Sequence, residues 1–202
     1  PGDRRVVKAQ WKTVDLSNFA VTGGTNVNVA IELGGCYSST VDNVEASCGY
    51  RASFVLVGRD ITLNNVRVDW LPFHDWGVKT KDYAIACVAN GDNITVRNST
   101  FAGDMQLVTS GGIYNYTHYL MCHDLKLVNN HLVSTSGVSA IGVRPNAEGT
   151  QIVGNTVLNG YVDVRGAYPL VTNNTITRNR LLLILQQLYS IDVTVIGNVF
   201  TS

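Results

Sequence analysis

An asparagine set between two stretches of alternating apolar residues recurs along the chain, and this repeat constrains the fold more than any other feature. The segments "ITLNNVRV", "ITVRNSTF" and "KLVNNHLV" share this form. Neighbouring copies lie 19 residues apart (Asn155 to Asn174) to 33 residues apart (Asn65 to Asn98). A period in this range indicates a repeat architecture. Aligned on the asparagine, the copies fall at Asn18, Asn43, Asn65, Asn98, Asn130, Asn155, Asn174 and Asn198.

Within each copy, apolar and polar residues alternate with a period of two, and β-branched residues are abundant. Both features are typical of β-strands. A second short strand precedes most copies, as in "SFVLV" and "YAIACV", and a third follows the asparagine. Turns rich in Gly, Asp and Asn separate the strands. Three short strands per repeat predict an all-β fold, a parallel solenoid of about eight coils, with residues 1–202 as one domain.

The recurring asparagine has a structural role in this prediction. Asparagine tolerates the left-handed backbone conformation that a sharp corner requires. Stacked strands are about 4.8 Å apart, so equivalent side-chain amides can form hydrogen bonds along the stack. We therefore predict an asparagine ladder at one corner of every coil, with a structural and not a catalytic role.

Composition limits the classes of function. The formal net charge is zero, whereas a nucleic-acid or anionic-membrane binder shows a basic excess. No apolar run reaches the roughly 20 residues that cross a bilayer. The four cysteines lack zinc-type spacing, and we predict neither a metal nor a cofactor. We expect the cysteines to be buried, with a Cys36–Cys48 disulfide as the alternative.

The segments "NITVRNSTF", "TQIVGNTVLNG" and "PLVTNNTITRN" resemble the coils of right-handed single-stranded parallel β-helix proteins, the pectin-lyase-like group. This group includes pectate lyases, polygalacturonases, alginate epimerases and bacteriophage tailspikes. The chain is most similar to a tailspike or tail-fibre β-helix domain. That resemblance implies recognition of a bacterial cell-surface polysaccharide, a homotrimer, and an extracellular or virion location. Cleavage of the polysaccharide stays open.

Two other functions stay open as well. A secreted polysaccharide lyase or glycoside hydrolase is the first, although the "NTD", "DD", "GHG" and "DPH" motifs of related enzymes are absent. A structural shaft of a fibre or virion appendage is the second. Fold resemblance alone does not decide among these functions.

Two long insertions, Asp69–Asp82 and Ala102–Gly112, are expected side by side on one flank, where long loops on a rigid scaffold usually carry function. Aromatic faces beside polar groups suit sugar rings. The alternative is that these aromatic side chains pack the loops against the scaffold. The predicted substrate-binding residues are Trp70, Trp76, Tyr114, Tyr116 and Tyr119, and the catalytic candidates are His74 and Asp75.

Carboxylates elsewhere in the chain have simpler explanations than catalysis. Asp60, Asp92 and Asp124 precede a strand at nearly the same phase of three repeats, and paired carboxylates can hydrolyse glycosides. We favour turn caps, because Asp at the start of a strand is common in that role. For Asp163 and Arg165 we favour a surface ion pair.

The expected partners follow from uncovered surfaces. In "LLLIL" (181–185) both faces of the strand are apolar, which favours cover by a symmetric copy. A solenoid also exposes strand edges at its ends, and no capping helix is evident in the sequence. We therefore expect the chain to be part of a longer protein, with additional domains or chains over both ends.

Overall fold

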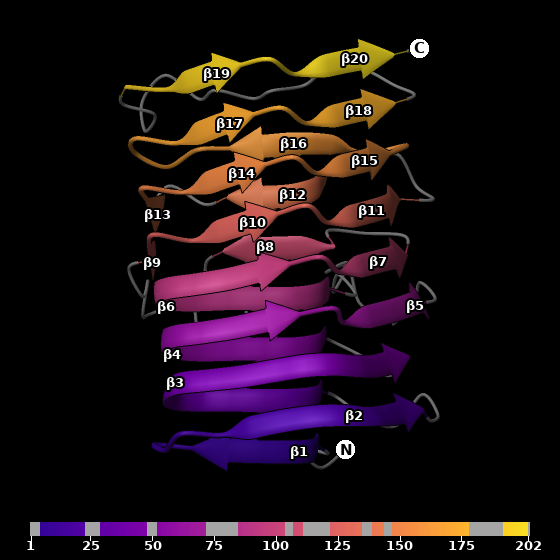
Figure 1. Ribbon diagram of the computed structural model, residues 1–202, viewed down its shortest axis with the longest axis vertical. Coiled ribbons are helices and arrows are strands. Elements are labelled where there is room, and N and C mark those ends of the chain that lie inside the picture. Colours follow the sequence, from indigo (N-terminus) through magenta and orange to yellow (C-terminus); the bar gives the residue numbers. More distant parts are fainter. Residues whose placement is uncertain are drawn as a thin grey trace, which may run out of the picture.

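The computed structural model describes residues 5–22, 29–47, 52–71, 85–103, 107–110, 122–134, 139–143, 147–177 and 192–201. These residues form β-strands and no helix. All twenty strands belong to one sheet, and every pairing between them is parallel. The all-β and parallel parts of the prediction are therefore confirmed. The strands stack along the long axis of the molecule (Figure 1).

The strands form three columns in which each strand pairs with its counterpart one repeat away. The first column starts with β1 and continues through the first parts of β3, β4 and β6 to β8, β12 and β16. Its strands are β1 (Arg5–Gln10), β3 (Val29–Ser47), β4 (Ala52–Asn64), β6 (Ile85–Arg97), β8 (Val108–Ser110), β12 (Ser139–Val143) and β16 (Tyr161–Val164).

The second column is formed by later parts of these long strands together with four short ones. It contains the start of β2 (Asp15–Thr22), the middle of β3, the ends of β4 and β6, then β10 (Lys126–Val128), β14 (Gln151–Val153), β17 (Leu170–Thr172) and β19 (Thr194–Ile196). Two short strands, β9 (Cys122–His123) and β13 (Ala147–Glu148), pair at the corner before this column.

The third column follows the asparagine corner. It contains the ends of β2 and β3, then β5 (Arg67–Leu71), β7 (Thr100–Gly103), β11 (His131–Ser134), β15 (Thr156–Leu158), β18 (Thr175–Thr177) and β20 (Val199–Thr201). Three columns of parallel strands are consistent with a β-solenoid.

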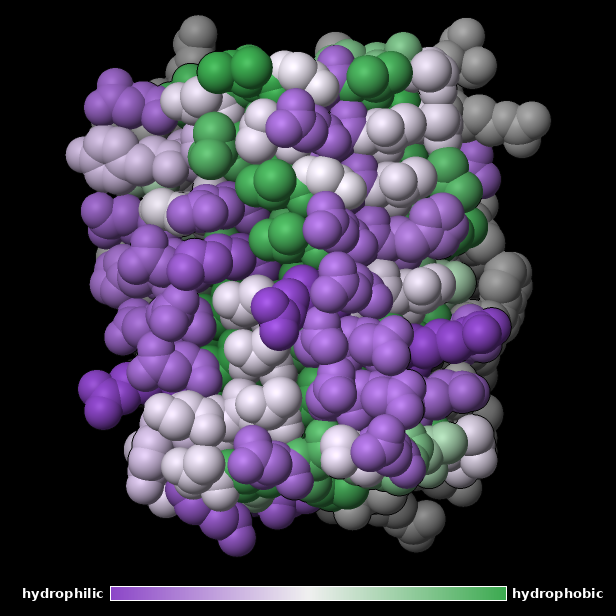
Figure 2. All heavy atoms as spheres, viewed as in Figure 1, coloured by the Kyte–Doolittle hydropathy of each residue, from purple (hydrophilic) through white to green (hydrophobic). Residues whose placement is uncertain are grey.

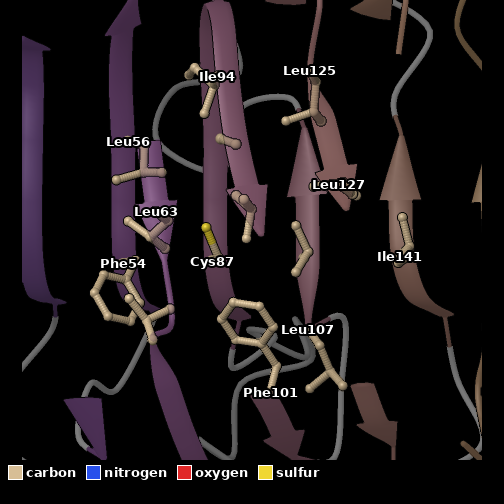
Figure 3. Packing of buried hydrophobic residues seen from close by; sticks show 14 of the residues in the cluster. Phe54, Leu56, Leu63, Cys87, Ile94, Phe101, Leu107, Leu125, Leu127 and Ile141 are labelled. Atoms are coloured by element: carbon tan, nitrogen blue, oxygen red, sulfur yellow. The ribbon is translucent and has the colours of Figure 1, made fainter. Parts of the chain in front are cut away.

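The core lies between the columns and consists of stacked apolar side chains. In the second column Leu63, Val96, Leu127 and Ile152 are at equivalent positions and are at most 1% exposed. Phenylalanines, leucines and isoleucines of successive repeats point into the same interior (Figure 3). Fully burying a side chain of this size stabilises a fold by about 1.5–3 kcal/mol, so repetition of this row stabilises the stack.

Hydrophobic side chains become exposed at the C-terminal end of the stack. The last strands, β19 and β20, carry Val195, Ile196, Val199 and Phe200, which are 40–63% exposed. Hydrophobic residues gather at this end in Figure 2, whereas the middle of the same face is mostly hydrophilic.

The corner between the second and third columns is a row of left-handed residues. Their positive φ angles turn the chain, and strand register places them directly above one another. Asparagine and glycine occupy the row because they adopt this conformation at the least cost. The row consists of Asn18, Asn43, Asn65, Asn98, Asn129, Gly154, Asn173 and Gly197.

This row corrects the alignment of the repeat. Four of the eight aligned asparagines, Asn18, Asn43, Asn65 and Asn98, are in the left-handed row and are exposed. The other four, Asn130, Asn155, Asn174 and Asn198, lie one residue later, after the turn, and the first three of them are at most 2% exposed. The eight asparagines therefore occupy two adjacent positions and not the single one that the alignment predicted.

The cysteines are buried where the structure describes them. Cys36, Cys87 and Cys122 are free thiols and at most 1% exposed, as predicted. The Cys36–Cys48 disulfide is therefore wrong, and Cys48 lies outside the described residues. Burial raises the pKa of Cys87 to about 12 and that of Cys122 to about 11, because an apolar interior disfavours the thiolate.

Candidate functional site

A groove of about 390 Å³ runs along the left-handed corner of the first repeats. It spans three successive rungs, in the lower part of Figure 1, where β2, β3 and the β4–β5 link turn from the second column into the third. Its walls are polar at the corner and apolar at the base. The lining residues are Asn18, Phe19, Ala20, Asn43, Val44, Glu45, Asn65 and Arg67.

Asparagine amides form one wall of this groove. Nδ2 of Asn43 donates to Oδ1 of Asn18 at 2.8 Å, and Nδ2 of Asn65 donates to Oδ1 of Asn43 at 3.2 Å. Each such bond uses one of the two amide hydrogens and one of the two oxygen lone pairs. Because these side chains are exposed, the remaining donors and acceptors face solvent at the spacing of the strands.

Charged side chains border the other wall. Arg67 follows the corner residue Asn65 by two positions and pairs in register with Glu45 on the neighbouring rung. Nε of Arg67 donates to Oδ2 of Asp69 at 2.7 Å. The hydrogen bond to Asp69, the charge of Asp69 and that of Glu45 all raise the pKa of Arg67. The guanidinium is therefore paired with Asp69, and the charge of Glu45 on the neighbouring rung acts on it as well.

A second polar row borders the corner on the side of the second column. Nδ2 of Asn64 donates to Oδ1 of Asp42 at 2.6 Å, and Nε of Arg97 donates to Oδ1 of Asn64 at 3.1 Å. Nδ2 of Asn98 donates to the same oxygen, at 2.9 Å, and not to Asn65. The chain of corner amides therefore runs from Asn18 to Asn65 and then shifts to the neighbouring row.

The buried asparagines belong to a separate column that faces the interior. Nδ2 of Asn130 donates to Oδ1 of Asn155 at 3.0 Å, and Nδ2 of Asn155 donates to Oδ1 of Asn174 at 3.0 Å. Nδ2 of Asn174 donates to Oδ1 of Asn198 at 2.8 Å. The same oxygens accept the backbone N–H groups of Asn130, Asn155 and Asn174. These contacts satisfy buried polar groups, and the side chains are not available to a ligand.

Most of the predicted site residues lie outside the described part of the chain. His74, Asp75, Trp76, Tyr114, Tyr116 and Tyr119 are among them. Trp70 lies within strand β5, three residues beyond Arg67, and only its backbone is described. The predicted insertion Asp69–Asp82 therefore begins at the edge of the groove. The predicted apolar strand 181–185 also lies outside the described residues.

The three aspartates expected at one phase occupy two rows. Asp60 and Asp124 have positive φ and align with Asn93, whose Nδ2 donates to Asp60 at 2.8 Å. This geometry fits a turn role. Asp92 is one residue out of phase and aligns with Arg59 and His123 instead.

Asp92 belongs to an exposed cluster that sequence reasoning missed. Nδ1 of His123 lies 3.0 Å from Oδ1 of Asp92, and its Nε2 lies 3.6 Å from Oε2 of Glu148. The three side chains stack on consecutive rungs, and each is more than 40% exposed. Exposure of this extent makes each charge pair weak, so we regard the cluster as a surface network.

The interpretation of Asp163 and Arg165 as a surface pair is wrong, because the carboxylate is buried. The Asp163 side chain is 5% exposed, and Arg165 donates to it from Nε at 2.9 Å and from Nη2 at 2.6 Å. The hydrogen bond to Asp163 raises the pKa of Arg165. This forked geometry anchors strand β16 and leaves the carboxylate engaged.

The sequence matches no known family, and neither a curated protein nor a solved structure shows significant similarity to it. Within the described residues, no group of three His, Cys, Asp or Glu side chains is arranged to hold a metal ion. No helix in that part of the chain is long and apolar enough to span a membrane.

The groove residues outside the asparagine row were missed by sequence reasoning. A signal was present: "NVEA" and "NVRV" place Glu45 and Arg67 two residues after the corner asparagine, in consecutive repeats. Opposite charges at one phase of neighbouring parallel strands indicate a cross-strand pair on the outer surface.

Proposed function

We propose that this protein is a right-handed parallel β-helix of about eight coils that binds an extended polysaccharide along the asparagine corner. The observation that carries the proposal is the chain of exposed amides from Asn18 to Asn65 in the wall of the groove. Hydroxyl groups both donate and accept hydrogen bonds, as the remaining amide positions do. A polymer laid along the groove meets an asparagine amide at each of its three rungs.

The remaining features of the groove support the same kind of ligand. Phe19 and Val44 contribute apolar surface to its lining, although both pack against the core, and apolar surface beside hydrogen-bonding groups suits a sugar ring. The groove also adjoins the start of the insertion Asp69–Asp82, which carries Trp70 and Trp76. These aromatic residues, with Tyr114, Tyr116 and Tyr119, belong to the proposed binding surface.

The biological setting in this proposal rests on the tailspike resemblance. A bacterial cell-surface polysaccharide is the proposed ligand, and a homotrimer on a virion or outside the cell is the proposed assembly. Further domains or chains would cover the ends of the stack. His74 and Asp75 are the candidates for cleavage, if the polysaccharide is cleaved.

The test is binding of a panel of capsular and lipopolysaccharide glycans, measured by calorimetry. The variant Asn43→Gly with Asn65→Gly removes two groove amides, and glycine retains the positive φ. Each hydrogen bond contributes about 0.5–1.5 kcal/mol, so we expect affinity to fall by about tenfold or more. Asn173→Gly is the matched control, because Asn173 has the same conformation in the same row but lies outside the groove.

Two results would contradict the proposal. The first is that no glycan of the panel binds to the wild-type protein. The second is that a bound glycan is unaffected by the double substitution. Product sizing after incubation with the bound glycan then separates a binding protein from a depolymerase.

A further inference from the structure

The charges of the groove narrow the class of polysaccharide, an inference that rests on the proposed function. Among the described lining residues, the ionisable side chains are Glu45 and Arg67. Arg67 is the group that a negatively charged polymer would need. Its position decides whether that charge is available to a ligand.

The positive charge of Arg67 is offset by two carboxylates, those of Asp69 and Glu45. Asp69 accepts a hydrogen bond from its Nε at 2.7 Å, and Glu45 occupies the paired position on the adjacent strand. Paired positions of parallel strands are about 4.8 Å apart. Asp69 occupies the Nε donor of Arg67. A ligand carboxylate at the other N–H groups of the guanidinium would meet repulsion from both acidic side chains.

The row on the other side of the corner adds no excess of positive charge. Arg97 donates to Asn64, and Asn64 in turn donates to Asp42. Counting both rows, the described groove and its borders carry two arginines and three carboxylates. The local charge is negative by one, which disfavours a polyanion.

The amide wall is matched to hydroxyl groups instead. Each amide of the row presents both a donor and an acceptor, whereas a carboxylate can use only the donors. An alcohol group satisfies either position and adds no charge. Recognition through such a wall is insensitive to ionic strength, because screening acts on charges.

We infer that the groove takes an uncharged, hydroxyl-rich glycan and excludes acidic polymers such as polyuronates. Glu45 and Asp69 are the residues that set this specificity, because they mask Arg67. Removing both carboxylates leaves a guanidinium beside a row of amide donors, an arrangement that suits a carboxylated sugar.

The test compares polygalacturonate with neutral polysaccharides (dextran, mannan and uncharged O-polysaccharides) on the wild-type protein and on the variant Glu45→Gln with Asp69→Asn. We expect the wild-type protein to bind polygalacturonate too weakly to measure. The variant should bind it with an affinity at least tenfold above that detection limit, and this affinity should fall as salt rises. Asp92→Asn with Glu148→Gln is the control. It also removes two negative charges, but from the His123 cluster, and should not increase the affinity for polygalacturonate.

The outcomes separate this inference from the proposed function. Tight binding of polygalacturonate by the wild-type protein, reduced by the substitutions at Asn43 and Asn65, overturns the inference and keeps the groove as a glycan site. An equal gain in both charge variants also overturns it, because the effect would then follow net charge alone. Absence of glycan binding in every arm refutes the proposed function and the inference with it.

Discussion

Replacing Asn155 with alanine tests whether the buried asparagine column stabilises the stack. Asn155 is 1% exposed, and its Oδ1 accepts both the backbone N–H and the Nδ2 of Asn130. Its Nδ2 donates to the backbone oxygen of Leu127 at 2.8 Å and to Asn174. Nδ2 also contacts the backbone oxygen of Val153 at 3.2 Å. One side chain thus connects three successive repeats, and alanine removes all five contacts.

The magnitude follows from which groups lose a partner. The N–H of Asn130 loses the acceptor that it has among the described residues, and the oxygen of Leu127 loses a donor. Nδ2 of Asn130 still donates to the backbone oxygen of Val96, and Oδ1 of Asn174 still accepts a hydrogen bond from the backbone N–H of residue 155. Each buried group left unpaired costs about 1–3 kcal/mol, so we expect a loss of roughly 3 kcal/mol.

The assay is urea denaturation followed by far-ultraviolet circular dichroism, with hydrogen exchange of the Asn130 amide as a local measure. Asn43→Gly is the control: it removes two exposed amide contacts, whose partners stay in water, and should cost less than about 1 kcal/mol. Asn155→Ser should recover part of the loss, because the hydroxyl of Ser99, at the equivalent position, accepts the N–H of Val66. Equal costs for Asn155→Ala and Asn43→Gly would refute the reasoning.

Three further predictions concern single residues of the scaffold. Burial raises the pKa of Cys87 from 9.0 to about 12, so the unfolded chain loses this proton first as pH rises. The titration of Cys87 should therefore lower stability by roughly 1 kcal/mol per pH unit above about pH 9. Urea midpoints should show that Cys87→Val removes this contribution, while the similar one of Cys122 remains. Asp163→Ala should cost about 3 kcal/mol in the same assay, the low end for a broken buried pair, since Arg165 keeps some contact with water. Gly91→Ala should lower the thermal midpoint, because its φ is 135° and the added methyl would overlap the oxygen of Gly58.

Each of these predictions has an outcome that contradicts it. An alkaline slope that is as steep in Cys87→Val as in the wild-type protein would assign the effect to other groups. If Asp163→Ala left the free energy of unfolding unchanged, hydration of Arg165 would compensate fully for the lost ion pair. Asp163→Asn is the conservative comparison. If Gly91→Ala matched Ala102→Gly in its small effect, the close approach of the Gly58 and Gly91 backbones would not limit the fold.

Sequence periodicity predicted the strands well, but not which asparagine makes the turn. In "NNV", "NNH" and "NNT", two consecutive asparagines offer the same side chain for two adjacent positions. The first of the pair takes the left-handed turn at Asn129 and at Asn173, and the second takes it at Asn65. The pairs "GN" hold the missing signal: at Gly154 and Gly197 the glycine makes the turn, and the following asparagine is the interior residue.

The candidate site could be predicted only in part, for a related reason. Glu45 and Arg67 share a phase of the repeat, so their pairing follows from alignment. The masking of Arg67 by Asp69 depends on side-chain rotation on one strand, which no pattern encodes. Asp92 was misplaced by one residue, since a shift of one position in a strand moves a side chain to the other row.

The sequence by itself determined that the chain folds into repeated parallel strands. Alternation with a period of two, β-branched residues and a recurring turn residue act locally and repeat with every rung. Only the tertiary structure decided which amides face the interior and which face the groove, and which carboxylates lie beside Arg67. Those choices depend on the register between rungs that are far apart in sequence, because a buried amide is stable only where a partner from the next rung reaches it.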